Sequence, residues 1–432
     1  RKFQGWKCMR SKSDKKKSLV PSLRFPEFRE AGAWEVKRLG ELASRITGRV
    51  GSKKLIPISI SSGVGFVSQA EKFGRDISGK QYEKYIALER GQFSYNKGNS
   101  KTFPQGSIYQ LQEFEDAAVP NAFYSFEFKK KYVPEFYNGY FEKNFHGHQL
   151  ARFITSGARS DGLLNISAAD FFSIVLPTPT NRDEQQKIAH CLSSLDEVIG
   201  LQAKKVQALK QHKKGLMQQL FPAEGETTPR LRFPEFREAG AWEVKELIKL
   251  AGRGTERNQK GKIKRVLTNS AEHGVLDQRE YFDKDIAIQG NLENYFVVDQ
   301  GDFVYNPRIS SFAPVGPISR NDVGKGVMSP LYTVFSFRQS DTDFFAHYFN
   351  SSAWHSYMRK VGSTGARHDR MAISNSDFLA MPLSVPNPKE QQKIAHCLSS
   401  LDEVIGLESH KLDALKNLKK GLMQQLFPQD VA

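Results

Sequence analysis

Two long stretches of the chain place apolar residues at alternating intervals of four and three, the spacing of one helical face. They cover residues 181–222 and 387–428, and each closes on a proline, which cannot continue a helix. Heptads sustained over this length predict a coiled-coil seam. The alternative is a pair of amphipathic helices, each packed on its own domain. The apolar positions are Ile188, Leu192, Leu195, Ile199, Val206, Leu209, Leu216 and Leu220, then Ile394, Leu398, Leu401, Ile405, Leu412, Leu415, Leu422 and Leu426. The same two slots of each series are polar: Gln202 and Lys213, then Glu408 and Lys419.

The second helix has a clear start. Asn387 suits the N-cap, Pro388 suits the first helical position, and Glu390 lies three residues after the cap. This arrangement predicts a capping box, in which the cap and the glutamate satisfy each other's backbone N–H groups.

The chain is a tandem duplication. Between the repeated segments, residues 38–180 and 246–386 diverge and share only short pieces, such as Gly91–Asn96 and Gly301–Asn306. Matching frames around divergent inserts suggest one scaffold that carries two specificities, while drift after an ordinary duplication is the alternative. The identical segments are Leu23–Lys37 with Leu231–Lys245, Glu184–Leu201 with Glu390–Leu407, and Gly215–Pro222 with Gly421–Pro428.

The two helices are expected to run antiparallel. Each would be about 40 residues and therefore roughly 60 Å long. Only Ala223–Arg230 separate the first helix from the second globular region. A parallel pair would require that region, with a radius of gyration of about 15 Å, to carry the chain back along the whole helix.

The divergent regions predict mixed α+β domains. Their strand-like segments are rich in β-branched and aromatic residues, and one amphipathic helix is expected in each copy. Predicted strands are Leu55–Ser61, Gly91–Tyr95, Phe123–Phe128, Ile174–Pro177, Phe303–Tyr305 and Tyr332–Phe337, and predicted helices are Pro134–Thr155 and Phe344–Val361.

Composition favours a polyanionic partner. The 432 residues carry a net charge of +16, and nucleic acid is the first candidate for such a basic protein. The first 20 residues contain eight Lys or Arg and one acid, which we interpret as a basic arm and not as a signal peptide. With no apolar run of membrane-spanning length and three cysteines without a CxxC pair, we expect a cytoplasmic protein that contacts no membrane.

No catalytic constellation accompanies the charge. The sequence has no GxGxxG and no GxxxxGK[ST] loop. Asn306–Arg308 falls one residue short of an amino-methyltransferase motif, and we interpret it as a turn after a strand. Glu35–Lys37 and Glu243–Lys245 match the ExK part of a nuclease motif without its Pro-Asp partner, and they fit strand edges better. We expect His190-Cys191 and His396-Cys397 to serve helix packing and no metal site.

A globular region followed by EQQKIA and a heptad helix ending in LMQQLFP, all present twice, resembles the DNA-specificity subunit of type I restriction-modification systems. The resemblance covers about Leu23 to Pro428. It implies an α+β protein with two target-recognition domains in tandem, separated by two long helices that form an antiparallel coiled coil with pseudo-twofold symmetry. The expected boundaries are a basic arm at 1–22, target-recognition domains at 23–180 and 231–386, spacer helices at 181–222 and 387–428, a linker at 223–230 and a tail at 429–432.

The resemblance also implies partners. Each domain would bind one half of a bipartite, asymmetric site on double-stranded DNA. The helices would act as spacer and as docking surface for two methyltransferase subunits, which in turn recruit restriction and translocase subunits. No cofactor is expected on this chain, because S-adenosylmethionine, ATP and Mg²⁺ would belong to those partners. The alternatives are a stand-alone two-module DNA methyltransferase or nuclease, and a pure coiled-coil scaffold.

Two loops in each domain are candidates for base contacts. Arginine suits guanine, asparagine suits adenine, and glycine permits close backbone approach. The loops are Tyr95–Lys101 and Ser156–Asp161 in the first domain, and Asn306–Ser311 and Ser363–Arg370 in the second. The predicted DNA-binding residues are Asn96, Lys97, Asn99, Lys101, Arg152, Arg159, Asn306, Arg308, Ser310, Arg367, His368 and Arg370.

A second, shorter apolar stripe lies outside the seam. Apolar surface that remains after the helices pair predicts a partner, and contact with the chain's own domains is the alternative. The stripe comprises Cys191, Val198 and Leu201, with Cys397, Val404 and Leu407.

Overall fold

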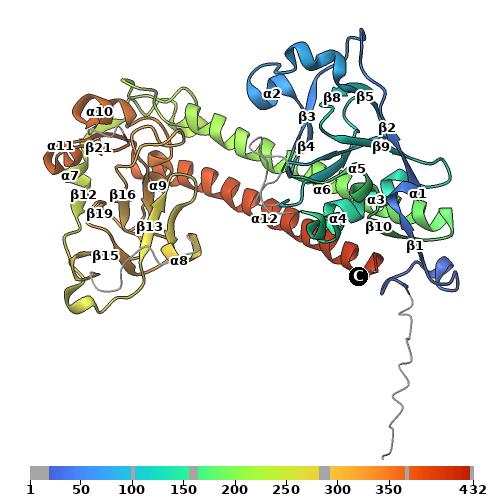
Figure 1. Cartoon of the computed structure of the whole chain (residues 1–432). Coiled ribbons are helices and arrows are strands. Elements are labelled where there is room, and N and C mark those ends of the chain that lie inside the picture. The colour runs from blue at the N-terminus through green and yellow to red at the C-terminus, as the bar shows by residue number, and fades with distance from the viewer. Residues whose placement is uncertain (1–18, 99–102, 155–163, 282–291, 365–368, 429–432) are drawn as a thin grey trace, which may run out of the picture. The chain divides into compact units, whose positions relative to one another are not determined.

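A computed structural model describes residues 19–98, 103–154, 164–281, 292–364 and 369–428. Figure 1 shows the chain with its helices and strands labelled. It divides into two compact units, one formed by residues 1–201 with 411–432 and the other by residues 202–410. Each unit therefore contains one α+β region together with one half of each long helix.

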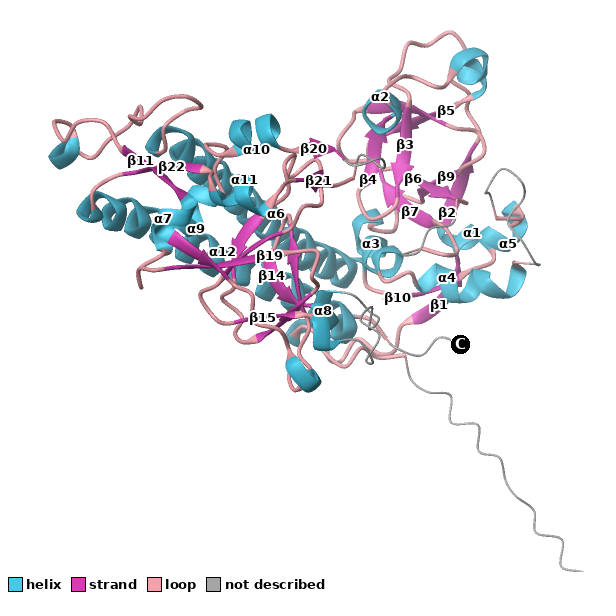
Figure 2. Ribbon diagram, turned by 90° about the vertical axis from the view of Figure 1, so that its left-hand side faces the viewer, coloured by secondary structure: helices cyan, strands magenta, loops and turns pink. Residues whose placement is uncertain are grey.

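The first unit is built on a four-stranded antiparallel sheet in the order β2-β9-β6-β7, with its strands side by side in Figure 2. Three two-stranded pairs, β3-β4, β5-β8 and β1-β10, complete the unit. The strands are β1 Glu35–Arg38, β2 Ala43–Ile46, β3 Ile58–Ser61, β4 Gly65–Ser68, β5 Ile86–Glu89, β6 Phe93–Asn96, β7 Ser107–Gln110, β8 Asp116–Val119, β9 Tyr124–Phe128 and β10 Val175–Thr178.

The second unit repeats this topology despite its different sequence. Its main sheet has the order β12-β19-β16-β17, and β13-β14, β15-β18 and β11-β22 match the smaller pairs of the first unit. One further pair, β20-β21, has no counterpart among the described residues of the first unit. The strands are β11 Glu243–Glu246, β12 Ala251–Arg253, β13 Leu267–Ser270, β14 Gly274–Asp277, β15 Phe296–Val298, β16 Phe303–Tyr305, β17 Ile318–Arg320, β18 Gly326–Met328, β19 Thr333–Phe337, β20 Ser363–Thr364, β21 Met371–Ala372 and β22 Pro382–Val385.

The helices are mostly short, apart from the two repeated ones. No helix in the described part of the chain is both long and apolar enough to cross a membrane. The helices are α1 Leu39–Leu42, α2 Gln69–Phe73, α3 Pro134–Glu142, α4 Phe145–Leu150, α5 Ala168–Phe172, α6 Arg182–Leu220, α7 Leu247–Leu250, α8 Gln278–Tyr281, α9 Asp343–Phe349, α10 His355–Val361, α11 Asn375–Leu379 and α12 Pro388–Leu426.

The single helix predicted in each divergent region is wrong, because two helices stand in each place. In the first unit, Asn144 has a φ of 53°, and this left-handed residue ends α3 before α4 begins. In the second unit, the hydroxyl of Ser351 donates to the carbonyl oxygen of Tyr348 at 2.6 Å after α9 has ended. Serine side chains that bond nearby backbone in this way compete with helix continuation.

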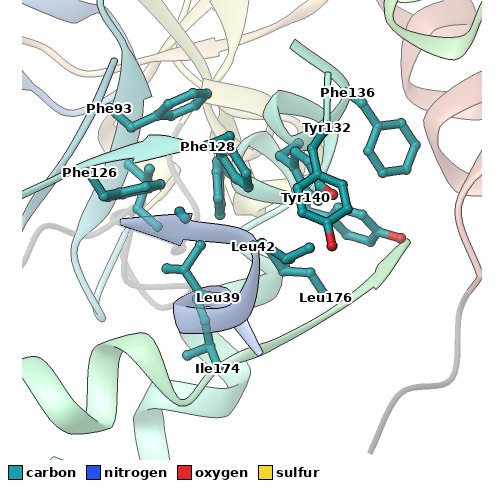
Figure 3. Packing of buried hydrophobic residues seen from close by; sticks show 14 of the residues in the cluster. Leu39, Leu42, Phe93, Phe126, Phe128, Tyr132, Phe136, Tyr140, Ile174 and Leu176 are labelled. Atoms are coloured by element: carbon teal, nitrogen blue, oxygen red, sulfur yellow. The ribbon is translucent and has the colours of Figure 1, made fainter. Parts of the chain in front are cut away.

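Aromatic side chains fill the core of the first unit. The rings of Phe93 and Phe126 stack with centroids 5.3 Å apart, and the rings of Phe128 and Tyr137 lie 4.1 Å apart. Figure 3 shows these phenylalanines packed beside the aliphatic residues Leu39 and Leu42, which come from α1. The second unit has an equivalent aromatic core beneath its main sheet.

The long helices run antiparallel. In the first unit, Ile188 and Leu192 near the start of α6 share a core with Met423 and Leu426 near the end of α12. In the second unit the relation is reversed, since the end of α6 shares a core with the start of α12. The residues of the long helices in this second core are Met217, Leu220 and Phe221 at the end of α6, and Ile394 and Leu398 near the start of α12. Every apolar position of both predicted heptad series is buried or half-buried, which confirms the seam.

The polar slots of the seam form bonds across it. Gln202 occupies the first polar slot of α6, and its amide Nε2 donates to the Glu408 carboxylate at 2.6 Å. Lys205 contacts the same carboxylate at 2.5 Å. Because Glu408 is the repeat-related slot of α12, the two interruptions of the heptads meet each other. Polar groups at such positions fix the register of a coiled coil.

The second polar slot carries a lysine in both helices. Lys213 lies 2.5 Å from the Asp402 carboxylate in the second unit, and the repeat-related Lys419 lies 2.6 Å from Asp196 in the first. Glu142 of α3 adds a second carboxylate beside Lys419 at 2.7 Å. The same register device is therefore present twice.

A buried ion pair ties the RFPEF segment of each unit to the start of a long helix. Arg24 donates through Nε and Nη2 to the two oxygens of Glu184, both at 2.7 Å, and the indole of Trp34 donates to the same carboxylate at 3.2 Å. We call this arrangement the helix-start clamp. The clamp of the second unit consists of Arg232, Glu390 and Trp242.

The clamp corrects the predicted capping box in part. The side chain of Asn387 accepts a hydrogen bond from the Glu390 backbone N–H at 3.1 Å, as expected of an N-cap. The Glu390 carboxylate, however, is held by Arg232 and Trp242. The glutamate therefore serves tertiary packing of the helix start.

Candidate nucleic-acid interface

The first predicted loop of the second unit, between β16 and β17, is held in a fixed shape. The phenol of Tyr305 donates to the carbonyl oxygen of Val315 at 3.0 Å, which closes the loop at its base. Burial raises the pKa of Tyr305 far above its ordinary value, so the phenol remains a donor. Gly316 has a φ of +81°, and a Cβ there would lie 2.1 Å from the carbonyl oxygen of Asn306. Only glycine fits this position.

The first unit builds the same frame from its own sequence. Tyr95 donates to the carbonyl oxygen of Gln105 at 2.6 Å, and Gly106 has a φ of +83°. Asn96 stands where Asn306 stands in the second unit, and its side-chain oxygen accepts from the Gly98 backbone N–H at 2.9 Å. The two units thus share one loop frame but present different side chains on it.

In the second unit the two predicted loops lie together, whereas Ser156–Asp161 of the first unit lies outside the described residues. In the second unit, the Ile309 N–H donates to the carbonyl oxygen of Asp369 at 2.9 Å, and the Met371 N–H donates to that of Pro307 at 2.8 Å. In the first unit, the Leu164 N–H donates to the carbonyl oxygen of Lys97 at 3.0 Å. Backbone pairing therefore joins segments that are sixty or more residues apart in sequence.

Several predicted contact residues present charge at these loops. Arg308 and Arg370 are exposed neighbours joined by a backbone bridge, and no carboxylate among the described residues pairs with either guanidinium. Lys97 is half-buried, with its ammonium 4.6 Å from the centre of the Tyr124 ring. Arg152 is exposed on the short 3₁₀ turn that follows α4. Arg152, Arg308 and Arg370 are thus the exposed cations among the described members of the predicted set.

Other predicted residues shape the loops instead of extending from them. The Asn306 side chain donates to the carbonyl oxygen of Asn269 at 2.8 Å and accepts from the Arg308 N–H at 3.0 Å. The hydroxyl of Ser310 accepts from the Ala313 N–H at 3.1 Å. Asn99, Lys101, Arg159, Arg367 and His368 lie outside the described residues, so their predicted roles stay predictions.

The stripe outside the helix seam is exposed as predicted. Leu201 is 60% exposed in the first unit, and Leu407 is 73% exposed in the second. Val198 and Val404 are exposed beside them. The stripe is thus repeated on the long-helix segments of both units.

The duplicated His-Cys pairs differ from expectation. His190 and His396 are exposed and do not serve helix packing, whereas Cys191 and Cys397 are half-buried with free thiols. His190 bonds Ser194 one turn further along the helix at 3.0 Å. No cluster of three or more potential metal ligands occurs in the described parts of the chain.

Two features of the units escaped prediction from the sequence. The helix-start clamp joins residues about 150 positions apart, and its only signal was the repetition of RFPEF and AGAW beside a repeated glutamate. The exposed ring of Phe312 lies in the divergent part of the β16–β17 loop, where its single signal was an aromatic residue among polar ones.

Comparison with known proteins connects this geometry to a family. A family model described as "Type I restriction modification DNA specificity domain" matches residues 32–211 and 250–417. A candidate specificity subunit of the type I restriction enzyme MjaX, from Methanocaldococcus jannaschii, is 24% identical over 320 residues, which cover 69% of this chain and 68% of the relative. The type I restriction enzyme MjaVIII specificity subunit of the same organism is 22% identical over 427 residues, covering 94% and 93%.

A solved structure shares the fold. The crystal structure of the type I restriction-modification S subunit from M. genitalium is 13% identical and has a TM-score of 0.55. The match covers 96% of this chain and 100% of that one. The tandem α+β architecture therefore occurs in a solved protein with a very different sequence.

Proposed function

The chain belongs to the type I restriction-modification DNA specificity family, and from this premise we propose that each of its α+β units binds one half of a bipartite, asymmetric DNA site. As a specificity subunit, the chain is the non-catalytic, DNA-recognising component of such a system. A stand-alone methyltransferase or nuclease, the alternative from the sequence, gains no support from the family match.

The observation that carries the proposal is the duplicated loop frame. Tyr95 with Gly106, and Tyr305 with Gly316, hold equivalent loops by the same two devices. The side chains presented between them differ, since Lys97 and Gly98 in one unit stand where Pro307 and Arg308 stand in the other. A fixed frame with variable side chains suits two readers of different base sequences.

Charge supports DNA as the ligand. Release of counterions by Lys and Arg supplies much of the affinity of DNA-binding proteins, and the chain carries 63 such residues against 47 acids. Arg308 and Arg370 stay exposed without acidic partners among the described residues. By contrast, Arg24 and Arg232 are buried against carboxylates for a structural purpose.

We further propose that the exposed apolar stripe docks the modification subunits of the complex. Val198 and Leu201 in one unit, with Val404 and Leu407 in the other, give two equal surfaces for two copies of one partner. The repeated helices would then serve as both spacer and docking surface. S-adenosylmethionine, ATP and Mg²⁺ are expected on the partner subunits.

The test of reading is selection from a random duplex library with the purified full chain. We expect enrichment of two specific blocks separated by a gap of fixed length and free sequence. In the double variant Arg308→Ala/Arg370→Ala, the second block should lose information while the first is retained. One continuous block, or equal loss from both blocks in the variant, would contradict the proposal.

The test of docking uses Leu201→Lys and Leu407→Lys. Each change should weaken the binding of one of the two modification subunits that the chain captures. DNA selection by the chain alone should be unchanged. Ile248→Lys, at an exposed apolar position of α7 and away from the long helices in sequence, is the control. Unaltered capture by the double variant would refute this docking surface.

A further inference from the structure

A hollow of about 550 Å³ opens beside the predicted base-contact loops of the second unit. The β16–β17 loop forms one wall, the β13-β14 hairpin forms another, and the turn before β19 forms the third. Arg308 and Arg370 line it together with Phe312, Leu331 and Tyr332. Neutral polar groups and the exposed carboxylate of Glu272 complete the lining, so the hollow has two arginines against one acid and an apolar part.

The apolar part is exposed and held in place. Phe312 is 70% exposed, and Leu331, across the hollow, is 58% exposed. Ser310 and Ala313 exchange two backbone hydrogen bonds, of 3.1 and 3.2 Å, so the turn that carries Phe312 is closed on both sides. Two large apolar side chains thus share one hollow without burying each other.

The two arginines are available to a polyanion. Within the same unit, Arg265 is paired with Asp277 and Arg320 with Asp343, at 3.0 and 2.5 Å. Arg308 and Arg370 have no such partner among the described residues. The two arginines complement the phosphates of duplex DNA. The apolar part of the hollow beside them complements a base edge that carries an apolar group.

The chemistry of the four base edges indicates which base fits the apolar part of the hollow. In the major groove each base edge presents donors and acceptors, and the only apolar group among the four bases is the C5-methyl of thymine. We propose that this hollow receives a thymine of the second half-site, with its methyl group against Phe312 and Leu331. Phe312 is then a specificity-determining residue of the second unit. This inference rests on the proposed function, since it names a base within the site that the second unit binds.

The test removes the methyl group and nothing else. Once selection with the full chain has defined both blocks, each thymine of the second block is replaced in turn by deoxyuridine. Burial of one methyl contributes about 0.8 kcal/mol, which corresponds to about a fourfold change in affinity. We expect a fourfold loss at one thymine for the unaltered chain, a smaller loss for Phe312→Ala, and equal binding of thymine and uracil by Phe312→Ala/Leu331→Ala.

Controls separate this contact from general weakening. Phe312→Leu should keep part of the preference for thymine, and Ile248→Ala, at an exposed apolar position on α7, should keep all of it. Replacements in the first block should not respond to Phe312→Ala. A second block without thymine, no loss with uracil, or a preference that is undiminished in Phe312→Ala/Leu331→Ala would each overturn the inference while leaving two-block reading intact. Failure to enrich any block would instead refute the proposed function as well.

Discussion

Replacing Arg232 by methionine should destabilise the second unit by about 3–5 kcal/mol, because the change leaves the Glu390 carboxylate buried without its charge partner. Glu390 is 0% exposed, and it loses two charge-assisted hydrogen bonds of 2.6 and 2.7 Å. Among the side chains that the structure describes, the Trp242 indole, at 3.3 Å, would be the one donor left to this carboxylate. The cost of burying a charge without compensation therefore dominates the effect.

Urea unfolding measures this free energy, and hydrogen exchange at the start of α12 assigns the loss to the second unit. The double variant Arg232→Met/Glu390→Met should recover most of the stability, because apolar side chains of similar volume remove the unpaired charge. Arg237→Met, at an exposed arginine of the same segment, should change stability by less than about 0.5 kcal/mol. The reasoning fails if Arg232→Met costs under 1 kcal/mol, or if the double variant is less stable than the single one.

Two further predictions concern the core and the seam. Burial lowers the pKa of His146 to about 4, so the folded chain rejects a proton that the unfolded chain takes up near pH 6.5. His146 should contribute about 2 kcal/mol to the loss of stability between pH 7 and pH 5, and His347 of the second unit, whose pKa burial also lowers to about 4, should contribute a similar loss. Urea unfolding at pH 7 and pH 5 tests this, because His146→Phe should lose about 2 kcal/mol less than the unaltered chain, and an equal loss would contradict it. In the seam, Lys213→Glu should lower the thermal midpoint by placing two carboxylates together, and adding Asp402→Lys should restore it. If the second change lowers the midpoint further, the Lys213–Asp402 contact does not set the register.

Much of the helical architecture could be predicted, because local signals determine it. The heptad spacing, the N-cap Asn387 and the terminal prolines all act within a few residues, and the short connection at 223–230 indicated the antiparallel arrangement. The helices of the divergent regions were predicted too long. Their breaks depend on a left-handed Asn144 and on a serine that bonds back to the helix, and neither has a strong signal in sequence.

The site was predictable only as a pair of loops. The polar segments beside Asn96 and Asn306 were predicted as base-contact loops, and in the second unit the structure places Asn306–Ser311 against the described end of the other predicted loop. What the side chains do there depends on long-range packing. The Asn306 side chain donates to the backbone carbonyl of Asn269, which lies on another strand. Phe312 lines the same hollow as Leu331, which lies on a different turn.

Exchange of one divergent region tests the central claim that the two units recognise DNA independently. Residues 38–180 are replaced by the matching region of a relative with a different target, and the bound sites are determined by selection from the same random duplex library. Residues 23–37 and both long helices are kept, so the clamp and the register contacts of α6 with α12 are unchanged. Two independent readers predict a new first block, with the second block and the gap length as before. A change in both blocks would show that the units read DNA jointly and would contradict the account.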